Sequence, residues 1–211
     1  MSSSAVPVGG PAVGSAGGAV PVSTESTRRR LSSRQAATVQ RLAEAALDEL
    51  RDQGYDGLTV RNVARRAGVA PATAYTYFAS REHLVTELFW RRLAALPETP
   101  VDRRRTPAAR ASATLGDLAL LVADEPELAA ACTVAMLATD PDVRLLRDRI
   151  GAEMHRRLVL ALGEGADPAV FRALELATFG ALVEAGTGHL SYEDLPALLS
   201  EVADLVLRGR S

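Results

Sequence analysis

Residues 59–78 read TVRNVARRAGVAPATAYTYF and divide into a helix, a tight turn and a second helix. Thr59 can cap the first helix, since its hydroxyl can accept a hydrogen bond from a backbone amide of the first turn. Gly68 ends this helix, because glycine enters the left-handed conformation without steric cost. Pro71 begins the second helix, because its fixed φ suits the first turn and its missing N–H costs nothing there. Two short helices joined by a turn that contains glycine form a helix-turn-helix.

The second helix of this motif has a composition that suits contact with DNA. Its leading residues are small, so its N-terminus can enter a major groove. The hydroxyls that follow can reach phosphate oxygens, and methyl groups can touch thymine. The alternative is an ordinary helical hairpin with two core tyrosines, because such short patterns recur by chance. The candidate DNA contacts are Arg61, Ala70, Pro71, Ala72, Thr73, Tyr75, Thr76, Tyr77 and Arg81, with Arg65 and Arg66 as further nearby cations.

The residues that follow Phe78 open a further helix, with Ser80 as its cap. From Arg34 to about Trp90 the chain resembles the DNA-binding domain of TetR-family regulators. Three positions depart from the usual form of that family: Ala70, Ala72 and Ala74 stand where serine, glycine and a larger aliphatic residue are frequent. These departures affect the operator sequence more than the fold. The residues that carry the resemblance are Gly54-Tyr55, Thr59-Val60, Val63-Ala64, Ala67-Gly68-Val69, Thr73, Tyr75, Tyr77-Phe78 and Ser80-Arg81-Glu82.

The composition of the 211 residues, 47% hydrophobic and only 4% aromatic, indicates a core of Leu, Val and Ala, as in an all-α helical bundle. The single cysteine, Cys132, excludes an internal disulfide framework and a cysteine-based zinc site. His83, His155 and His189 have no metal-ligand spacing, and we find no catalytic constellation. We therefore expect no enzyme, metal or cofactor. The apolar runs are too short to cross a bilayer, so we expect a cytoplasmic protein without a membrane partner.

Charge divides the chain into two parts. Residues 28–92 hold twelve Arg against seven acidic residues, a net charge of +5, whereas residues 93–211 hold twelve Arg against eighteen, a net charge of −6. This division suits a basic domain that meets phosphates and an acidic body that stays away from them. Residues 1–27, rich in Ser, Gly and Pro, predict a disordered tail. After them, Arg28, Arg29, Arg30 and Arg34 form either a solvated charge run or an arm that contacts DNA.

Apolar spacing and helix-start signals predict the remaining elements. The first helix should span 33–51 and end at Gly54, and a fourth helix from Ser80 to about Leu96 should link the DNA-binding part to the body. Asp124 is the expected cap before Pro126, and residues 191–194 resemble a capping box. No stretch alternates as a strand would. The expected body helices are 107–123, 126–138, 141–162, 168–186 and 191–208, and the expected domains are 28–92 for DNA binding and 97–211 for effector binding and dimerisation.

The last two helices carry small residues and apolar faces, which an ordinary buried bundle would also explain. The resemblance implies instead that they pair with their copies in a homodimer, which would place two recognition helices one DNA turn apart, about 34 Å. The middle helices should enclose a pocket, although each of its candidate residues, taken singly, suits a plain core better. Without a cluster of charges, such a pocket would take an apolar or amphipathic effector. The candidate lining is Leu118, Leu121, Val122, Cys132, Thr133, Met136, Met154, His155 and Phe179, with Leu128, Leu137 and Leu158 nearby.

Two functional hypotheses follow. The first is a homodimeric transcriptional repressor that binds a palindromic double-stranded DNA operator and is released by a small-molecule effector. In it, the effector tilts the fourth helix and so displaces the recognition helix. The second is a helical small-molecule-binding protein or enzyme whose basic domain is incidental. Salt distinguishes them, because binding to DNA weakens steeply as salt rises.

Overall fold

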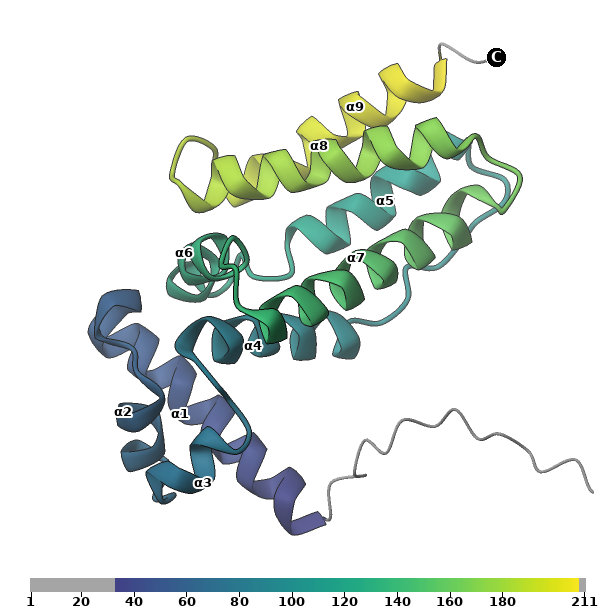
Figure 1. The fold of residues 1–211 in the computed structure, drawn as a ribbon. Helices are drawn as coiled ribbons and strands as arrows, with labels where there is room; N and C mark the ends of the chain where they lie inside the picture. Colours follow the sequence, from purple (N-terminus) through teal and green to yellow (C-terminus); the bar gives the residue numbers. More distant parts are fainter. Residues whose placement is uncertain (1–32, 209–211) are drawn as a thin grey trace, which may run out of the picture.

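The computed structural model describes residues 33–208 (Figure 1). Over this range the chain forms nine α-helices, one 3-10 helix and no strand, which confirms the all-α prediction. The expected tail at 1–27 and the arginines at 28–30 lie outside the described residues. The elements are α1 (Ser33–Gly57), α2 (Val60–Arg66), α3 (Pro71–Tyr75), α4 (Arg81–Ala95), α5 (Pro107–Ala119), α6 (Pro126–Ala135), α7 (Pro141–Leu162), α8 (Pro168–Gly186), η1 (Tyr192–Asp194) and α9 (Leu195–Arg208).

The local signals of the helix-turn-helix are present as expected. The hydroxyl of Thr59 accepts a hydrogen bond from the amide of Asn62 at 3.0 Å and so caps α2. Gly68 adopts a φ of 62°, which closes the turn, and Pro71 occupies the first turn of α3. Ala70 stands at the cap of α3 without a side-chain hydrogen bond. The start of the recognition helix therefore depends on packing and on Pro71.

Several expected helix ends and caps are wrong. α5 ends at Ala119 and α6 at Ala135, earlier than the expected 123 and 138. Gly54 bends α1 rather than ending it, because its φ of 65° kinks the backbone and the helix resumes as far as Gly57. Asp124 does not cap α6: its carboxylate pairs with Arg92 at 2.7 Å, and Glu125 occupies the cap position. The last helix begins at Leu195, since residues 192–194 form the 3-10 turn η1 before it.

The helices are arranged in two groups joined by α4 (Figure 1). The helix-turn-helix α2–α3 packs against α1, and α4 runs from it into the body, where it lies against α6 and α7. In the body α5 packs between α7 and α9, and α8 packs along α9. This order places α4 in contact with both the DNA-binding part and the wall of the body.

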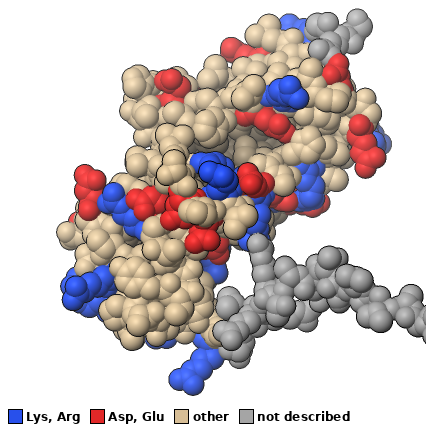
Figure 2. Space-filling model, viewed as in Figure 1, with Lys and Arg blue, Asp and Glu red and all other residues tan. Residues whose placement is uncertain are grey.

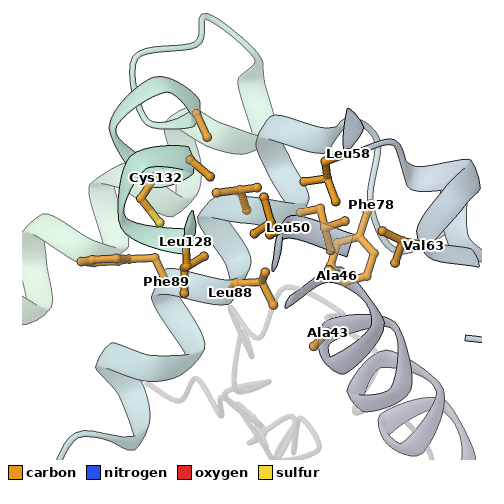
Figure 3. Close-up of a cluster of buried hydrophobic side chains, with 14 of the residues drawn as sticks. Ala43, Ala46, Leu50, Leu58, Val63, Phe78, Leu88, Phe89, Leu128 and Cys132 are labelled. Carbon is orange, nitrogen blue, oxygen red and sulfur yellow. The ribbon is translucent and has the colours of Figure 1, made fainter. Parts of the chain in front are cut away.

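The buried side chains form two clusters. The first spans α1 to α4 and continues into α6, and the second joins α5, α7, α8 and α9. Figure 3 shows the continuity of the first cluster: Leu128 and Cys132 of α6 lie beside Leu88 and Phe89 of α4. Because one apolar cluster includes residues on both sides of the expected domain boundary, a shift of α4 would disturb the packing in both parts.

Candidate DNA interface and effector cavity

The recognition helix α3 presents a largely polar face to solvent. Thr73, Tyr75 and Thr76 are exposed, and the ring of Tyr75 is 52% accessible. Tyr77 is half-buried against the first cluster, while the buried Ala74 and Phe78 hold the helix in place. The hydroxyl of Thr76 donates to the carbonyl of Thr73 at 2.6 Å. Ala70, Pro71 and Ala72 are exposed at the start of α3, so the expected contacts at this helix share one accessible surface.

A polar hollow of about 490 Å³ lies between α3 and the first turns of α1. Its lining combines three residues expected to contact DNA, Arg34, Thr73 and Tyr77, with others that sequence reasoning missed. The missed residues recur at helical spacing on α1, which is the signal that could have found them. They are Gln35, Thr38 and Arg41.

The arginines around the helix-turn-helix differ in their partners. Arg61 and Arg65 are exposed, and their side chains have no hydrogen bond or ion pair to any residue within 33–208. Arg66 pairs with the buried Glu49 at 2.8 Å and with Asp52 at 2.6 Å, so it holds α2 against α1. Figure 2 shows arginines projecting from the end of the molecule that carries α1–α3, while acidic side chains gather over its middle.

Arg81 is partly buried, with 36% of its side chain exposed, and is held by contacts within the protein. Its guanidinium lies 4.4 Å from the centre of the Tyr55 ring and pairs with Glu82 at 2.9 Å. The hydroxyl of Tyr55 also donates to Glu82 at 3.1 Å; burial and this bond raise the pKa of Tyr55 to about 12. Burial raises the pKa of Glu82, but the bonds from Arg81 and Tyr55 outweigh it and lower the pKa overall. These contacts join the start of α4 to the end of α1, and the expected contact of Arg81 with phosphate stays a prediction.

The N-terminus of α4 is bonded to the N-terminus of α7. The hydroxyl of Ser80, which caps α4, donates to Asp140 at 2.9 Å, and Asp140 itself caps α7. His83 lies 3.8 Å from Asp142. Partial burial raises the pKa of Asp140, but the hydrogen bonds from Ser80 and from the backbone amides of α7 outweigh it, so the pKa is lowered overall.

The C-terminus of α4 is bonded to α7 as well. Arg157 of α7 is buried and donates to the carbonyls of Leu93, Leu96 and Pro97 at 3.3, 2.7 and 2.9 Å. These carbonyls belong to the last turn of α4 and the residues after it, where a cation is favourable. Its guanidinium also pairs with Glu153 at 2.8 Å. Because α7 holds both ends of α4, the two helices form one unit, which we call the α4–α7 pair.

Two apolar hollows adjoin this pair. The inner cavity, of about 50 Å³, lies among α4, α6, α8 and η1. The larger hollow, of about 560 Å³, runs between α7 and α8, and we call it the α7–α8 groove. The two share Phe89, Met136, Phe179 and Leu182, so they adjoin each other. The inner cavity alone has room for one or two water molecules, whereas the groove has the volume of a small-molecule site.

The structure distributes the expected pocket residues over these hollows and the core. Val122, Cys132, Thr133, Met136 and Phe179 line the inner cavity, and Leu137 joins them. Met154 and His155 line the groove, together with Met136 and Phe179. Leu118 and Leu121 line neither; they are buried in the first cluster, as is Leu128, while Leu158 is buried in the second. Sequence reasoning missed Phe89, Arg147, Ile150, Arg172, Glu175, Leu182, Val183 and Tyr192.

The thiol of Cys132 is buried, and burial raises its pKa to about 12, so it lines the cavity as an apolar group. Over residues 33–208 no three His, Cys, Asp or Glu side chains gather as a metal site. Within the same range no helix combines the length and apolar character needed to span a bilayer.

Comparisons with known proteins agree with this geometry. Residues 36–88 match the family model described as "Bacterial regulatory proteins, tetR family". Over 178 residues, 83% of each chain, the protein is 49% identical to an uncharacterized HTH-type transcriptional regulator of Mycobacterium tuberculosis (strain H37Rv). It is 29% identical over 156 residues to the HTH-type transcriptional repressor KstR of Rhodococcus jostii (strain RHA1), covering 66% of this chain and 73% of that one.

Among solved structures, a TetR transcriptional regulator from Rhodococcus sp. RHA1 has the same fold, with a TM-score of 0.68 and 22% identity. That match covers 85% of this chain and all of the other. The family model falls on α1–α4, which hold the helix-turn-helix, and the Mycobacterium relative covers most of the body as well. The chain therefore belongs to the TetR family of DNA-binding transcriptional regulators.

Proposed function

We propose that the protein is a homodimeric repressor that binds a palindromic DNA operator and leaves it when a small apolar or amphipathic effector occupies the body. The observation that carries this proposal is the α4–α7 pair: α4 follows the recognition helix directly, while α7 forms a wall of the α7–α8 groove. The α4–α7 pair thus connects the recognition helix with the α7–α8 groove. The relation to KstR, which is named a repressor, supports repression rather than activation. A regulator of this kind acts where the chromosome is, which supports a cytoplasmic location.

The division of labour follows the charge of the two parts. We propose that residues 28–92 meet DNA through α3, Arg61 and the α1 side of the polar hollow, and that residues 97–211 hold the effector and the partner subunit. The outward sides of α8 and α9 support the latter assignment. Leu176 and Leu205 are 65% and 72% exposed there, and Gly180 is exposed between the leucines of α8 and leaves room for a partner helix. Two copies joined through these helices would form a four-helix interface.

We propose that the effector moves α4 and α7 together rather than tilting α4 alone. Because Ser80–Asp140 and Arg157 hold α4 at both ends, α4 moves only with α7. An effector that widens the α7–α8 groove would displace α7, and the α4–α7 pair would carry the recognition helix with it. The spacing of the two recognition helices in the dimer would then no longer match one DNA turn. A coupling of about 1–3 kcal/mol is enough for such a switch.

The test is selection of bound sites from random duplex DNA by the purified full-length protein at moderate salt. We expect enrichment of a palindrome whose half-sites lie about 10 bp apart. Affinity for the enriched site should fall steeply between low and high salt, as counterions are released from the phosphates. The absence of any enriched sequence, from protein that is folded and dimeric and has been freed of bound small molecules, would contradict the proposed operator binding.

A further inference from the structure

A second connection joins the DNA-binding part to the body, and it lies on α1, whose end is beside α6 (Figure 1). Arg51 of α1 donates to both carboxylate oxygens of Glu125, through Nε at 3.1 Å and through a second guanidinium nitrogen. The two residues are 74 positions apart in the chain, and Glu125 directly precedes α6. A guanidinium that donates two bonds to one carboxylate fixes orientation as well as distance. This pair therefore holds the end of α1 in one position against the start of α6.

The same carboxylate is shared with α4. Arg92 of α4 lies 3.4 Å from Glu125, and it donates to Asp124 at 2.7 Å. Only 14% of the Glu125 side chain is exposed, against 48% for Arg51 and 24% for Arg92. An isolated ion pair at the surface contributes little to stability, but a bidentate pair within a network of charges does hold structure. We call the set of Arg51, Arg92, Asp124 and Glu125 the α1–α4–α6 clamp.

The two acidic residues before α6 bond to other helices rather than to α6 itself. Glu125 occupies the cap position of α6, but its side chain accepts no hydrogen bond from the first turn of that helix. The carboxylate of Asp124 accepts from Arg92 instead. A carboxylate at the start of a helix commonly accepts a free amide of the first turn. Because both carboxylates are bonded to arginines of α1 and α4, their role is to join elements rather than to begin one.

Glu125 also lies one helical turn from the inner cavity. Its carbonyl accepts the amide of Ala129 at 2.9 Å, and Ala129 lines that cavity together with Cys132 and Thr133 of the same helix. A displacement of α6 within the body would therefore move Glu125 and, through it, Arg51. The clamp thus acts on α1, which the α4–α7 pair does not include.

We propose that Glu125 is a positioning residue for DNA binding. By holding α1 against α6 it fixes the orientation of the DNA-binding part relative to the body, and so the half-site spacing that the dimer accepts. Glu125 acts through Arg51 and contacts no DNA itself. This inference rests on the proposed dimeric repressor and names a residue that sets its operator geometry. Loss of the clamp should widen the range of spacings that the dimer tolerates, while the contacts with each half-site remain.

The test compares the selected operator with two altered duplexes, in which one base pair is added or removed between the half-sites. One base pair turns a half-site by about 35° and shifts it by about 3.4 Å. The full-length parent should bind both altered duplexes about tenfold more weakly than the operator, a factor within the usual range of coupling between sites. Glu125→Gln should bind the operator about fivefold more weakly than the parent does, yet bind the altered duplexes as the parent does, so its discrimination falls to about twofold. Fluorescence anisotropy measures all three affinities.

Three further variants show whether the effect passes through the pair. Arg51→Gln and the double variant Arg51→Gln/Glu125→Gln should each discriminate as poorly as Glu125→Gln, because all three break the same pair and the losses do not add. Asp48→Asn is the matched control. Asp48 also pairs with Arg51, at 3.1 Å, but it lies on α1 itself and is exposed. Its replacement should keep the parental discrimination.

A measurement without DNA checks the orientation directly. A nitroxide label at Ala72→Cys, on the exposed start of α3, marks each recognition helix, and the buried thiol of Cys132 stays unlabelled. Pulsed dipolar electron paramagnetic resonance then gives the distance between the two recognition helices of the dimer. Glu125→Gln should broaden this distance distribution, whereas Asp48→Asn should leave it as narrow as in the parent.

Three results would overturn this inference: parental discrimination in Glu125→Gln, an equal loss of affinity on all three duplexes, or an unbroadened distance distribution. An equal loss is what a purely structural role for Glu125 predicts. A parent that selects one spacing, with a Glu125→Gln protein that selects it as sharply, keeps the proposed function and removes the positioning role. A parent that selects no operator contradicts the proposed function, while broadened distances in Glu125→Gln would still support the clamp.

Discussion

The hydroxyls of Tyr75 and Tyr55 lie in different surroundings, and this difference makes a test at the scale of single residues. Tyr55 donates to Glu82 inside the protein, whereas the hydroxyl of Tyr75 has no partner within residues 33–208 and its ring is 52% exposed. Tyr75→Phe should therefore leave the unfolding midpoint unchanged. It should weaken DNA binding by the dimer about thirtyfold, because each subunit loses one hydrogen bond of about 1 kcal/mol. The loss should be equal on operator and random duplex, because a phosphate contact carries no sequence information.

The matched control is Tyr55→Phe, which should lower the free energy of unfolding by about 1 kcal/mol, since it leaves Glu82 without that donor. Fluorescence anisotropy gives the affinities, and urea denaturation gives the stabilities. A Tyr75→Phe protein with parental affinity for both duplexes would remove this hydroxyl from the DNA interface.

At the scale of the helices, two neighbouring arginines of α7 test whether α7 holds α4. Arg157 is buried and holds the end of α4, while Arg156 is largely exposed and pairs with Glu153 and Glu98 at the surface. Arg157→Gln should lower the free energy of unfolding by about 3 kcal/mol, because it leaves the buried carbonyls at the end of α4 without their charged donor. Arg156→Gln should cost less than about 1 kcal/mol, as exposed ion pairs do. Urea denaturation measures both, and equal losses would show that Arg157 does not join α4 to α7 in solution.

At the scale of the whole molecule, the apolar surface of α9 predicts the oligomeric state. Leu205→Glu places a charge in the proposed interface and should convert the dimer to a monomer, which sedimentation velocity detects. Operator affinity should fall at least about a hundredfold, because the two recognition helices are no longer linked. Leu145→Glu is the control, since Leu145 is 55% exposed on α7, which is not one of the proposed interface helices. A Leu205→Glu protein that stays dimeric and keeps its affinity would exclude α9 from the interface.

Local sequence predicts a helix well where its starting cap and its terminating glycine are both encoded within a few residues of its ends. α7 and α8 begin and end where expected, because Asp140-Pro141 and Asp167-Pro168 cap their starts and the glycines with positive φ, Gly163 and Gly188, follow their ends. The prediction fails at Asp124, whose carboxylate is drawn to Arg92, 32 residues earlier in the chain. It also fails at Gly54, where the kink permits a further helical turn. An ion-pair partner far away in the chain leaves no local signal, and neither does a glycine that bends a helix without ending it.

The residues of the candidate sites were likewise predictable where they lie within one short segment and not where helix packing brings them together. The composition of α3 indicates a DNA-contacting helix, because small and hydroxyl residues lie together within one short segment. On the α1 side of the polar hollow Arg34 was expected, but Gln35, Thr38 and Arg41 were missed, since they line the same hollow as Thr73 only through the packing of α1 on the helix-turn-helix. Phe89 and Tyr192 join the inner cavity from segments a hundred residues apart, and no periodicity brings them together.

The sequence by itself determined the helical fold, the position of the helix-turn-helix and the family, because caps, glycine turns and apolar spacing act over a few residues. Only the tertiary structure decided that α7 holds α4 at both ends and that an apolar groove opens between α7 and α8. Both depend on distances between side chains far apart in the chain, such as Arg157 and Leu96, and these distances are set by how the helices pack rather than by any one of them.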